Sequence, residues 1–372
     1  MLVEHAGQRR PQAAGTLGHR LVPDSTSRVT GSANSPVGSI ANKAPVTAGS
    51  NPAGGPLLGR REHNVRNLEV PFRGSDDGHD IAEREVPSVT VSPQVTERVR
   101  KPHWSLARTW LLQPGIPDGS EEYDAAAASS ADVVVLDIED GLPDAQKAAG
   151  RLSVAKWLDA GAREWVRINS ASTAALWSAD LDALANVHGL AGVLLAKTES
   201  ADDVAATAAR LPAGTPLVAL IESALGIEAA LDIARSPGCA RIAFGVGDFR
   251  RDTGMSADPT VLAYARARLV IASRAAGLPA PIDGPTLRDQ TRHLARETAV
   301  AKAAGMTARL CLDYEHAETI NSLLSPSALD IDEARATLAR LDAPTGPYDG
   351  SVGPTRARAE AVLDLAEKLG LT

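Results

Sequence analysis

The amino-acid sequence predicts an α/β fold, specifically a (β/α)8 TIM barrel, and two observations lead to this prediction. Eight short apolar runs alternate with helical patterns from Arg108 onward. This count and alternation match a barrel in which a helix follows each parallel strand. In addition, no Gly-x-Gly-x-x-Gly turn follows the first apolar run, which disfavours the alternative of an open, doubly wound sheet.

The predicted strands are short runs rich in Val, Leu, Ile and Ala, as expected for parallel strands buried on both faces. They cover residues 109–112, 133–138, 165–168, 192–195, 217–221, 241–244, 281–283 and 306–311. The predicted helices between them cover residues 120–130, 143–160, 174–185, 200–210, 223–234, 258–276 and 287–304. We therefore expect one barrel domain over residues 101–325.

A helical extension, residues 326–372, is predicted after the barrel. A helix over 313–323 precedes a Ser-Pro-Ser break, and two further helices follow over about 330–341 and 356–369. A loop rich in Gly and Pro joins these two helices at 343–354. A barrel does not need such an appendage, so we expect a lid or an arm that contacts another subunit.

Residues 1–100 are predicted to be a disordered N-terminal segment. They are rich in Ser, Gly, Pro, Thr and Asn, and Phe72 is the only aromatic residue before Trp104. Such a segment buries too little apolar surface to offset the entropy of ordering. A targeting peptide is the less favoured alternative, because no amphipathic arginine-rich helix is present.

Charge and composition exclude several classes of function. The formal net charge of −8 disfavours a nucleic-acid partner, because phosphate backbones repel an acidic protein. No apolar run reaches membrane-spanning length. Two cysteines, Cys239 and Cys311, cannot make a disulfide framework or a cysteine zinc site, so a reducing, cytoplasmic location is expected.

Two carboxylates follow consecutive predicted strands: Glu222 comes after 217–221 and Asp248 comes shortly after 241–244. Adjacent parallel strands joined by a helix bring their carboxyl ends together. We therefore expect both acids to be ligands of Mg²⁺ or Mn²⁺, with Gly245 and Gly247 allowing close approach of the backbone. The alternative is that each acid caps a helix or pairs with a basic residue.

A second acidic group, Asp137, Glu139 and Asp140, ends the second predicted strand. Three acids this close repel one another unless a cation lies nearby. They are candidate catalytic residues, and the alternative is a solvated turn.

Arg167 lies among apolar neighbours and needs a partner if it is buried. That partner is either Asp137 or Glu139, or a substrate carboxylate or enolate oxygen, which a guanidinium grips well.

Two further basic residues are candidates for substrate binding. Lys197 follows the fourth predicted strand, and Arg108 precedes the first. The sequence has no His-x-x-x-His, Gly-x-Ser-x-Gly or Walker-type phosphate loop, so nucleophilic hydrolase chemistry has no support.

From Arg108 onward the chain resembles the citrate lyase beta-subunit family, which belongs with the HpcH/HpaI aldolases. The matching motifs occur in family order: RTWLLQPG (108–115), ADVVVLDIED (131–140), VRIN (166–169), LLAKTE (194–199), ALIES (219–223), FGVGDF (244–249), AYARARLVIASRAAGLPAPIDG (263–284), LSPS (324–327) and YDG (348–350).

The resemblance implies a barrel of the phosphoenolpyruvate/pyruvate-binding type and a Mg²⁺-dependent carbon–carbon lyase acting through a metal-stabilised enolate. It implies that Glu222 and Asp248 hold the metal and that Arg167 contacts substrate. It also implies that Asp349, on the C-terminal loop, moves a proton in a neighbouring subunit's site, within a homotrimer or a hexamer. The implied substrate is a 3-hydroxyacyl-CoA such as malyl-CoA or citramalyl-CoA.

The chain also departs from the family pattern at two places. The family commonly has Pro-Gly-x-Arg-Pro-Glu after the first strand, where this chain has PGIPDG at 114–119. After the last strand the family commonly has Ile-His-Pro-x-Gln, where this chain has LDYEH at 312–316. Two alternatives therefore stay open. One is a class II-type aldolase that releases pyruvate from free 4-hydroxy-2-keto acids. The other is a non-catalytic accessory subunit, against which the intact Glu222, Asp248, Arg167 and Asp349 argue.

Overall fold

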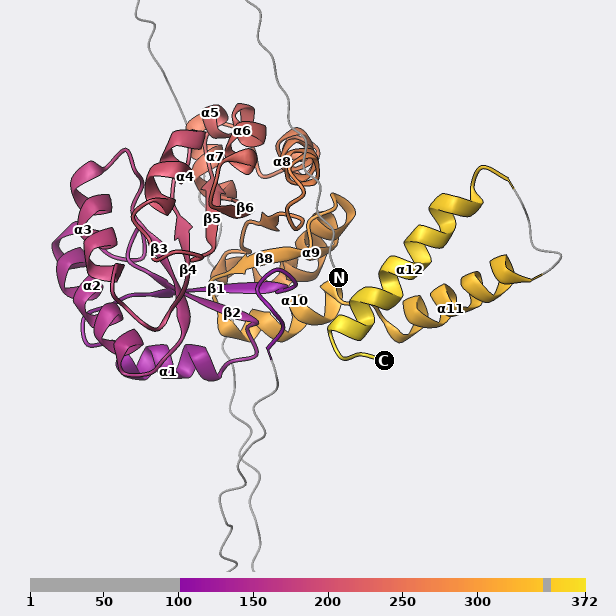
Figure 1. The fold of residues 1–372 in the computed structure, drawn as a ribbon, viewed down its shortest axis with the longest axis horizontal. Helices are drawn as coiled ribbons and strands as arrows, with labels where there is room; N and C mark the ends of the chain where they lie inside the picture. Colours follow the sequence, from indigo (N-terminus) through magenta and orange to yellow (C-terminus); the bar gives the residue numbers. More distant parts are fainter. Residues whose placement is uncertain (1–100, 344–348) are drawn as a thin grey trace, which may run out of the picture. The chain divides into compact units, whose positions relative to one another are not determined.

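Eight parallel strands form a closed barrel in chain order, β1 to β8, in the computed structural model of this protein (Figure 1). The structure describes residues 101–343 and 349–372, so the prediction of disorder for 1–100 lies outside the described residues. The strands are β1 Thr109–Pro114, β2 Val133–Asp137, β3 Glu164–Ile168, β4 Leu190–Leu195, β5 Leu217–Ile221, β6 Cys239–Phe244, β7 Ile282–Asp283 and β8 Ala308–Cys311. The predicted barrel is confirmed.

Helices follow the strands, and most of them surround the barrel (Figure 1). They are α1 Ser120–Ala128, α2 Asp144–Asp159, α3 Ala174–Leu184, α4 Ala201–Ala208, α5 Ala224–Glu228, α6 Ala230–Arg235, α7 Val246–Thr253, α8 Ala263–Ala275, α9 Leu294–Ala303, α10 Ala317–Leu324, α11 Ala328–Asp342 and α12 Val352–Lys368. Two 3-10 helices, Arg288–His293 and Tyr314–His316, precede α9 and α10.

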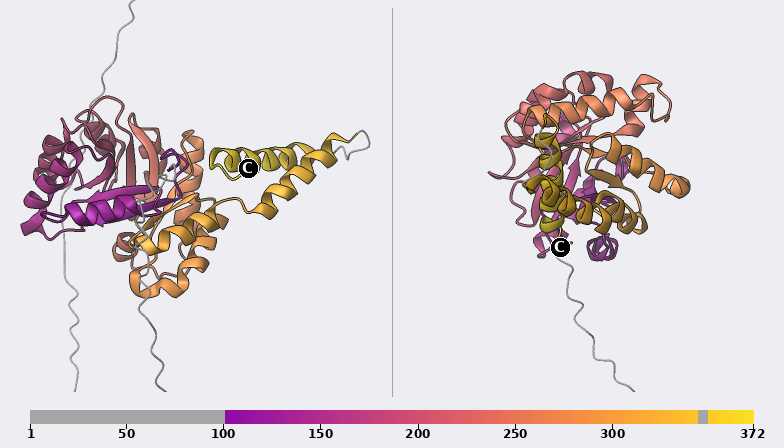
Figure 2. Two further views of the ribbon diagram at one scale, coloured as in Figure 1. Left: turned by 90° about the horizontal axis from the view of Figure 1, so that it is seen from below. Right: turned by 90° about the vertical axis from the view of Figure 1, so that its right-hand side faces the viewer.

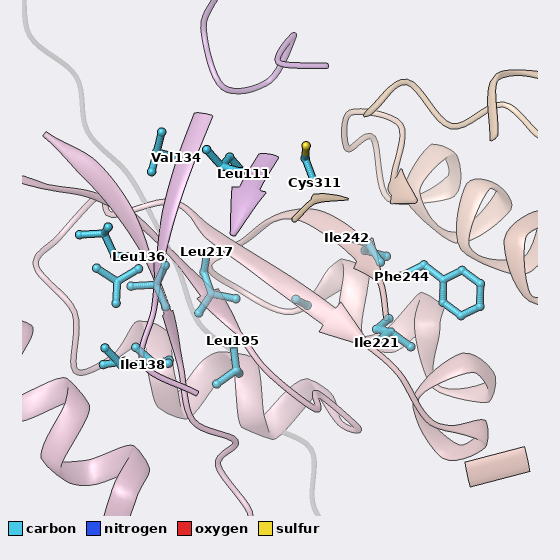
Figure 3. Close-up of a cluster of buried hydrophobic side chains, with 14 of the residues drawn as sticks. Leu111, Val134, Leu136, Ile138, Leu195, Leu217, Ile221, Ile242, Phe244 and Cys311 are labelled. Atoms are coloured by element: carbon cyan, nitrogen blue, oxygen red, sulfur yellow. The ribbon is translucent and has the colours of Figure 1, made fainter. Parts of the chain in front are cut away.

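Every strand except β7 divides its side chains between two apolar cores, because successive residues of a strand point to opposite faces. One core packs the outer faces of the strands against the helices; Leu136, Ile221 and Phe244 belong to it (Figure 3). The other core fills the barrel and contains Val135, Trp165 and their counterparts on other strands. This alternation explains why the strands are apolar on both faces.

The alternation also decides which polar side chains face into the barrel. Asp137 lies two residues after Val135, and Arg167 lies two residues after Trp165, so both share the inward face of their strands. The register between β2 and β3 pairs Asp137 with Arg167. The strands thus bring an acid and a base together at the carboxyl end of the barrel.

The C-terminal region forms a helical hairpin of α11 and α12, which extends away from the barrel in Figure 1 and in the left view of Figure 2. Ser327 begins α11 with a capping box, in which its hydroxyl accepts from the amide of Asp330 and the Asp330 carboxylate accepts from the amide of Ser327. Arg356 and Asp342 join the two helices by an ion pair of 2.6 Å. A search of the described helices finds none that is long and apolar enough to cross a membrane.

The structure differs from the predicted elements mainly on one side of the barrel. Helix α7 was not predicted, because Gly245 and Gly247 after β6 weaken a helical pattern. The single helix predicted over 223–234 is split into α5 and α6 at Ala229, whose backbone leaves the helical region.

Candidate active site at the carboxyl end of the barrel

Arg167 and Asp137 form a buried, bidentate ion pair. Nε of Arg167 lies 2.7 Å from Oδ1 of Asp137, and Nη2 lies 2.5 Å from Oδ2. A third nitrogen, Nη1, lies 3.3 Å from Oε2 of Glu139. Despite burial, which disfavours the charged form, these acids raise the pKa of Arg167 above its ordinary value. The guanidinium is therefore a fixed positive charge at the inner edge of the barrel.

Lys197 neutralises the rest of this acidic group. Its Nζ donates to Glu139 and, at 2.9 Å, to Oδ2 of Asp140. Burial raises the pKa of Glu139, and the opposing effects of Arg167 and Lys197 only partly offset that rise. Burial alone would also raise the pKa of Asp140, but the hydrogen bonds from Lys197 and Glu139 lower it overall.

Glu222 is a buried carboxylate, 5% exposed, directly after β5. Its Oε1 accepts a hydrogen bond of 2.7 Å from the backbone N–H of Lys197. Burial raises the pKa of Glu222 to about 8; Arg167 opposes this rise, and Asp248 adds to it. A buried carboxylate with so high a pKa gains stabilisation from a nearby cation.

Asp248 lies in the first turn of α7, a few residues beyond the end of β6. Its Oδ1 pairs with Nη1 of Arg251 at 2.9 Å, and its Oδ2 lies 4.0 Å from Nζ of Lys197. Glu222 contacts the backbone N–H of Lys197 and Asp248 lies near the ammonium of the same residue, so the two acids lie in one region of the site.

Glu222 and Asp248 suit a magnesium ion as two protein ligands. Mg²⁺ in proteins is commonly held by one or two carboxylates, while water and substrate oxygens complete its coordination. Within residues 101–343 and 349–372, no group of three or more His, Cys, Asp or Glu side chains could hold a metal. Two carboxylates, one of them buried with a raised pKa, are a donor set for a hard cation of this kind.

The two glycines after β6 differ in their surroundings. A Cβ atom on Gly245 would lie 2.3 Å from Oε2 of Glu222, whereas a Cβ atom on Gly247 would meet nothing within 4 Å. Gly245 therefore makes room for the Glu222 carboxylate. Gly247 is exposed and has no such contact in this chain.

A cavity of about 220 Å³ lies beside Arg167. Three apolar residues, Leu112, Pro114 and Leu312, line it together with Asp137, Asp140, Gly141 and Arg167. This volume suits a small acid or the acyl end of a larger molecule. The apolar part of its wall comes from β1 and from the residue after β8.

The structure also shows supporting residues to which the sequence analysis gave no role. Nζ of Lys147 donates to the backbone oxygen of Glu139 at 2.6 Å and to Oδ1 of Asn169 at 2.9 Å. Asn169 in turn donates to Asp180, which is paired with Arg151. This buried network fixes the loop that carries the acids. Asn169 could have been predicted as a site residue from the sequence, because it directly follows β3, just as Glu222 directly follows β5.

The structure brings most predicted site residues together at the carboxyl edge of the barrel. These are Asp137, Glu139, Asp140, Arg167, Lys197, Glu222, Gly245, Gly247 and Asp248.

Arg108 is not among them, which corrects the expectation that it binds substrate in this site. It precedes β1, at the opposite end of the barrel, where its Nε pairs with Asp132 at 2.8 Å and its Nη1 donates to Ser325 at 2.7 Å. A residue before a parallel strand lies at the amino end of the sheet, and the sequence analysis did not apply this distinction.

Asp349 lies between α11 and α12, exposed to solvent, and its Oδ1 accepts from the backbone N–H of Ser351 at 2.7 Å. Within one chain it takes no part in the barrel site, so its predicted role requires a second subunit.

Comparisons with known proteins agree with the geometry. Residues 121–313 match the family described as HpcH/HpaI aldolase/citrate lyase. A citrate lyase subunit beta-like protein of Mycobacterium tuberculosis is 31% identical over 268 residues, which cover 68% of this chain and 93% of the relative. A (3S)-malyl-CoA thioesterase of Cereibacter sphaeroides is 30% identical over 245 residues, covering 63% of this chain and 83% of the relative.

A solved structure gives the same result. The crystal structure of protein CitE from Mycobacterium tuberculosis, in complex with magnesium, acetoacetate and coenzyme A, superposes with a TM-score of 0.61 at 30% identity. The match covers 71% of this chain and 99% of that chain.

Proposed function

Because the chain belongs to the HpcH/HpaI aldolase/citrate lyase family, we propose that it is a Mg²⁺-dependent carbon–carbon lyase. The proposed reaction cleaves or forms a 3-hydroxyacyl-CoA such as malyl-CoA or citramalyl-CoA. The observation that carries the proposal is the convergence of Glu222, Asp248 and the fixed guanidinium of Arg167 at one edge of the barrel. The related CitE structure, with magnesium, acetoacetate and coenzyme A, supports the same cofactor and substrate class.

Glu222 and Asp248 would hold the metal, and when bound the ion would act as a Lewis acid toward a substrate oxygen. In the cleavage direction, a carboxylate of the site would take up the proton of the substrate's 3-hydroxyl as the bond between carbons 2 and 3 breaks. Its electron pair moves onto the thioester carbonyl, and carbon 2 then takes up a proton. Negative charge thus develops on oxygen, which a preorganised guanidinium such as that of Arg167 stabilises.

Asp137 positions the guanidinium of Arg167 through the bidentate pair. Glu139 and Asp140 hold Lys197 near it, and we assign these two cations to the binding of an anionic substrate. We assign proton transfer at carbon 2 to Asp349 of a neighbouring subunit. This assignment requires a homo-oligomer, for which we propose a trimer or a multiple of it. We also propose that the enzyme works in the cytoplasm, since a chain of 372 residues with only two cysteines has no disulfide framework.

An assay of the full chain with Mg²⁺ tests the proposal. The substrates are malyl-CoA, citramalyl-CoA and free 4-hydroxy-2-keto acids, each with and without EDTA. The readouts are keto-acid product, acyl-CoA product and free CoA, so that lyase and thioesterase reactions are separated. We expect Mg²⁺-dependent formation of a keto acid and an acyl-CoA, and its loss in Glu222→Gln and Asp248→Asn.

Each other outcome points elsewhere. Pyruvate released only from the free acids would favour the aldolase alternative, which the missing arginine in residues 114–119 already supports. Free CoA without cleaved carbon chains would indicate a thioesterase. Metal-independent activity, or none on the whole panel, would contradict the proposed function.

A further inference from the structure

Lys197 connects the two acidic groups of the site through two different parts of the residue. Its backbone N–H donates to Glu222 at 2.7 Å. Its ammonium lies among three other carboxylates: it binds Glu139, lies 2.9 Å from Asp140, and approaches Oδ2 of Asp248 to 4.0 Å. One lysine therefore contacts or approaches both candidate metal ligands.

The backbone of Lys197 has an unusual conformation that makes this double contact possible. Its φ of +49° lies in the left-handed region, which residues other than glycine seldom occupy. The next residue, Thr198, fixes the turn: its N–H donates to Leu220 at 2.9 Å and its hydroxyl donates to Leu195 at 3.0 Å. Backbone outliers of this kind are found at functional sites, where the surrounding structure supports them. The turn after β4 thus fixes the backbone of Lys197, and Glu139 and Asp140 hold its ammonium.

We propose that Lys197 is the internal counter-cation of the site. Its ammonium neutralises Glu139, Asp140 and Asp248 before a divalent cation binds, and it opposes that cation at Asp248. Two positive centres near one carboxylate repel each other, so metal binding must displace the lysine from Asp248 toward Glu139 and Asp140. The affinity for metal is therefore lower than the two carboxylate ligands alone would give. This inference rests on the proposed Mg²⁺-dependent function.

Arg251 also pairs with Asp248, at 2.9 Å, but it is not placed to act in this way. Its side chain is 71% exposed, against 32% for Lys197. Water and salt screen an exposed ion pair, and its contribution is small. Arg251 therefore supplies a matched comparison: a second cation on the same carboxylate, but in solvent.

The experiment measures metal binding directly. Mn²⁺ is titrated into the full chain, and free Mn²⁺ is followed by electron paramagnetic resonance. We expect Lys197→Met, which keeps most of the length of the side chain and removes its charge, to bind Mn²⁺ about tenfold more tightly than the wild type. Arg251→Met should tighten binding less than about threefold, since its pair is exposed. The ammonium of Lys302 donates to the backbone oxygens of Leu323 and Ser325, outside the site. Lys302→Met removes this charge and should leave the affinity for Mn²⁺ unchanged.

Thermal unfolding provides a second readout. Without metal, Lys197→Met leaves the acids facing one another uncompensated, so its Tm should fall below that of the wild type. Saturating Mn²⁺ should then raise the Tm of Lys197→Met more than it raises that of the wild type. Lys197→Arg, which keeps the charge, should behave as the wild type in both measurements.

The outcomes separate this inference from the proposed function. Equal or weaker Mn²⁺ binding by folded Lys197→Met, with the wild type binding normally, would overturn the counter-cation role alone. Equal tightening in Lys302→Met would also overturn it, because the effect would then reflect net charge. If neither the wild type nor any variant bound Mn²⁺, both the inference and the metal-dependent function would be overturned.

Discussion

Asp137 and Arg167 are partners in the register of β2 and β3, and their side chains form a two-point ion pair at the carboxyl end of the barrel. The pair orients the guanidinium by two of its three nitrogens. Nη1 remains directed toward Glu139, at 3.3 Å. A planar, preorganised cation at this edge is suited to a developing negative charge on oxygen.

This arrangement makes the shape of the Arg167 side chain as important as its charge. We expect Arg167→Lys to lower kcat/KM by about 10²- to 10³-fold, nearly as much as Arg167→Ala, because an ammonium cannot keep both bonds to Asp137 and a contact with substrate. The loss should appear in kcat as well as in KM if the contact strengthens in the transition state. Steady-state kinetics on the cleavage reaction checks this, and near-normal kinetics for Arg167→Lys would mark the residue as a structural partner of Asp137.

A matched pair of glycine substitutions tests the position of Glu222. In Gly245→Ala the new Cβ would lie 2.3 Å from Oε2 of Glu222, so the carboxylate must move. We expect Mg²⁺ affinity and kcat/KM each to fall at least about tenfold, because a displaced ligand no longer points at the metal. Gly247→Ala adds a methyl group where nothing lies within 4 Å, and it should retain both. Calorimetric Mg²⁺ titration and kinetics compare the two variants; similar values for both would contradict the proposed place of Glu222 in the site.

The raised pKa of Glu222 predicts a pH dependence of metal binding. With a pKa of about 8, this carboxyl is largely protonated at pH 6.5, and a bound metal must displace the proton. As the pH rises toward 8, the Kd for Mg²⁺ should therefore fall about tenfold per pH unit, and above pH 8 it should level off. Glu222→Gln removes the titrating group, so its weak binding should lack this slope. A wild-type Kd that is flat between pH 6.5 and 8 would contradict the prediction.

The same pKa has an effect of defined sign on the metal-free fold. A carboxyl whose pKa is raised from 4.5 to about 8 on folding binds its proton more tightly in the folded state. Its contribution to the free energy of unfolding is complete below pH 4.5 and is lost as the pH rises toward 8. In EDTA, denaturant unfolding of the wild type should therefore show a decline across this window that is smaller in Glu222→Gln.

The eight strands could be predicted from the sequence because their signal is local. Each is a short apolar run bounded by polar or helical residues, and only the ends differ, as where β4 begins at Leu190 and β6 at Cys239. The helix that was missed, α7, begins at Val246 directly after β6. Gly247 in its first turn disfavours a helix, and Gly254, with a φ of +72°, marks its end only after the helix is known.

The candidate site could be predicted where the chain direction decides the position. Asp137, Arg167, Lys197 and Glu222 all lie at or just after carboxyl strand ends, and parallel strands bring those ends together. Arg108 lies before a strand, and the structure places it at the other end of the barrel. The contacts of Lys147 depend on packing between α2 and the loop after β2, which no local pattern reveals.

The last prediction concerns a site shared between subunits. Asp349 lies in the α11–α12 hairpin, and this hairpin extends away from its own barrel (Figure 2). A carboxylate there is ordinarily a turn residue, and the hydrogen bonds from Ser351 lower its pKa, which keeps it ionised. In a closed oligomer each subunit can supply such a hairpin to a neighbour.

We therefore expect Asp349→Ala and Glu222→Gln subunits, each inactive alone, to regain part of their activity when they are unfolded, mixed and reassembled. Some sites then combine an intact barrel with an intact loop. As a control, Asp349→Ala subunits are mixed with subunits that carry both Lys302→Met and Asp349→Ala. Both kinds of subunit supply an intact barrel and neither supplies an intact loop, so this mixture should stay inactive. Mixed oligomers should be verified by mass spectrometry of differently tagged subunits. If verified mixtures of Asp349→Ala and Glu222→Gln stayed inactive, the site would be built within one chain, and Asp349 would be a turn residue.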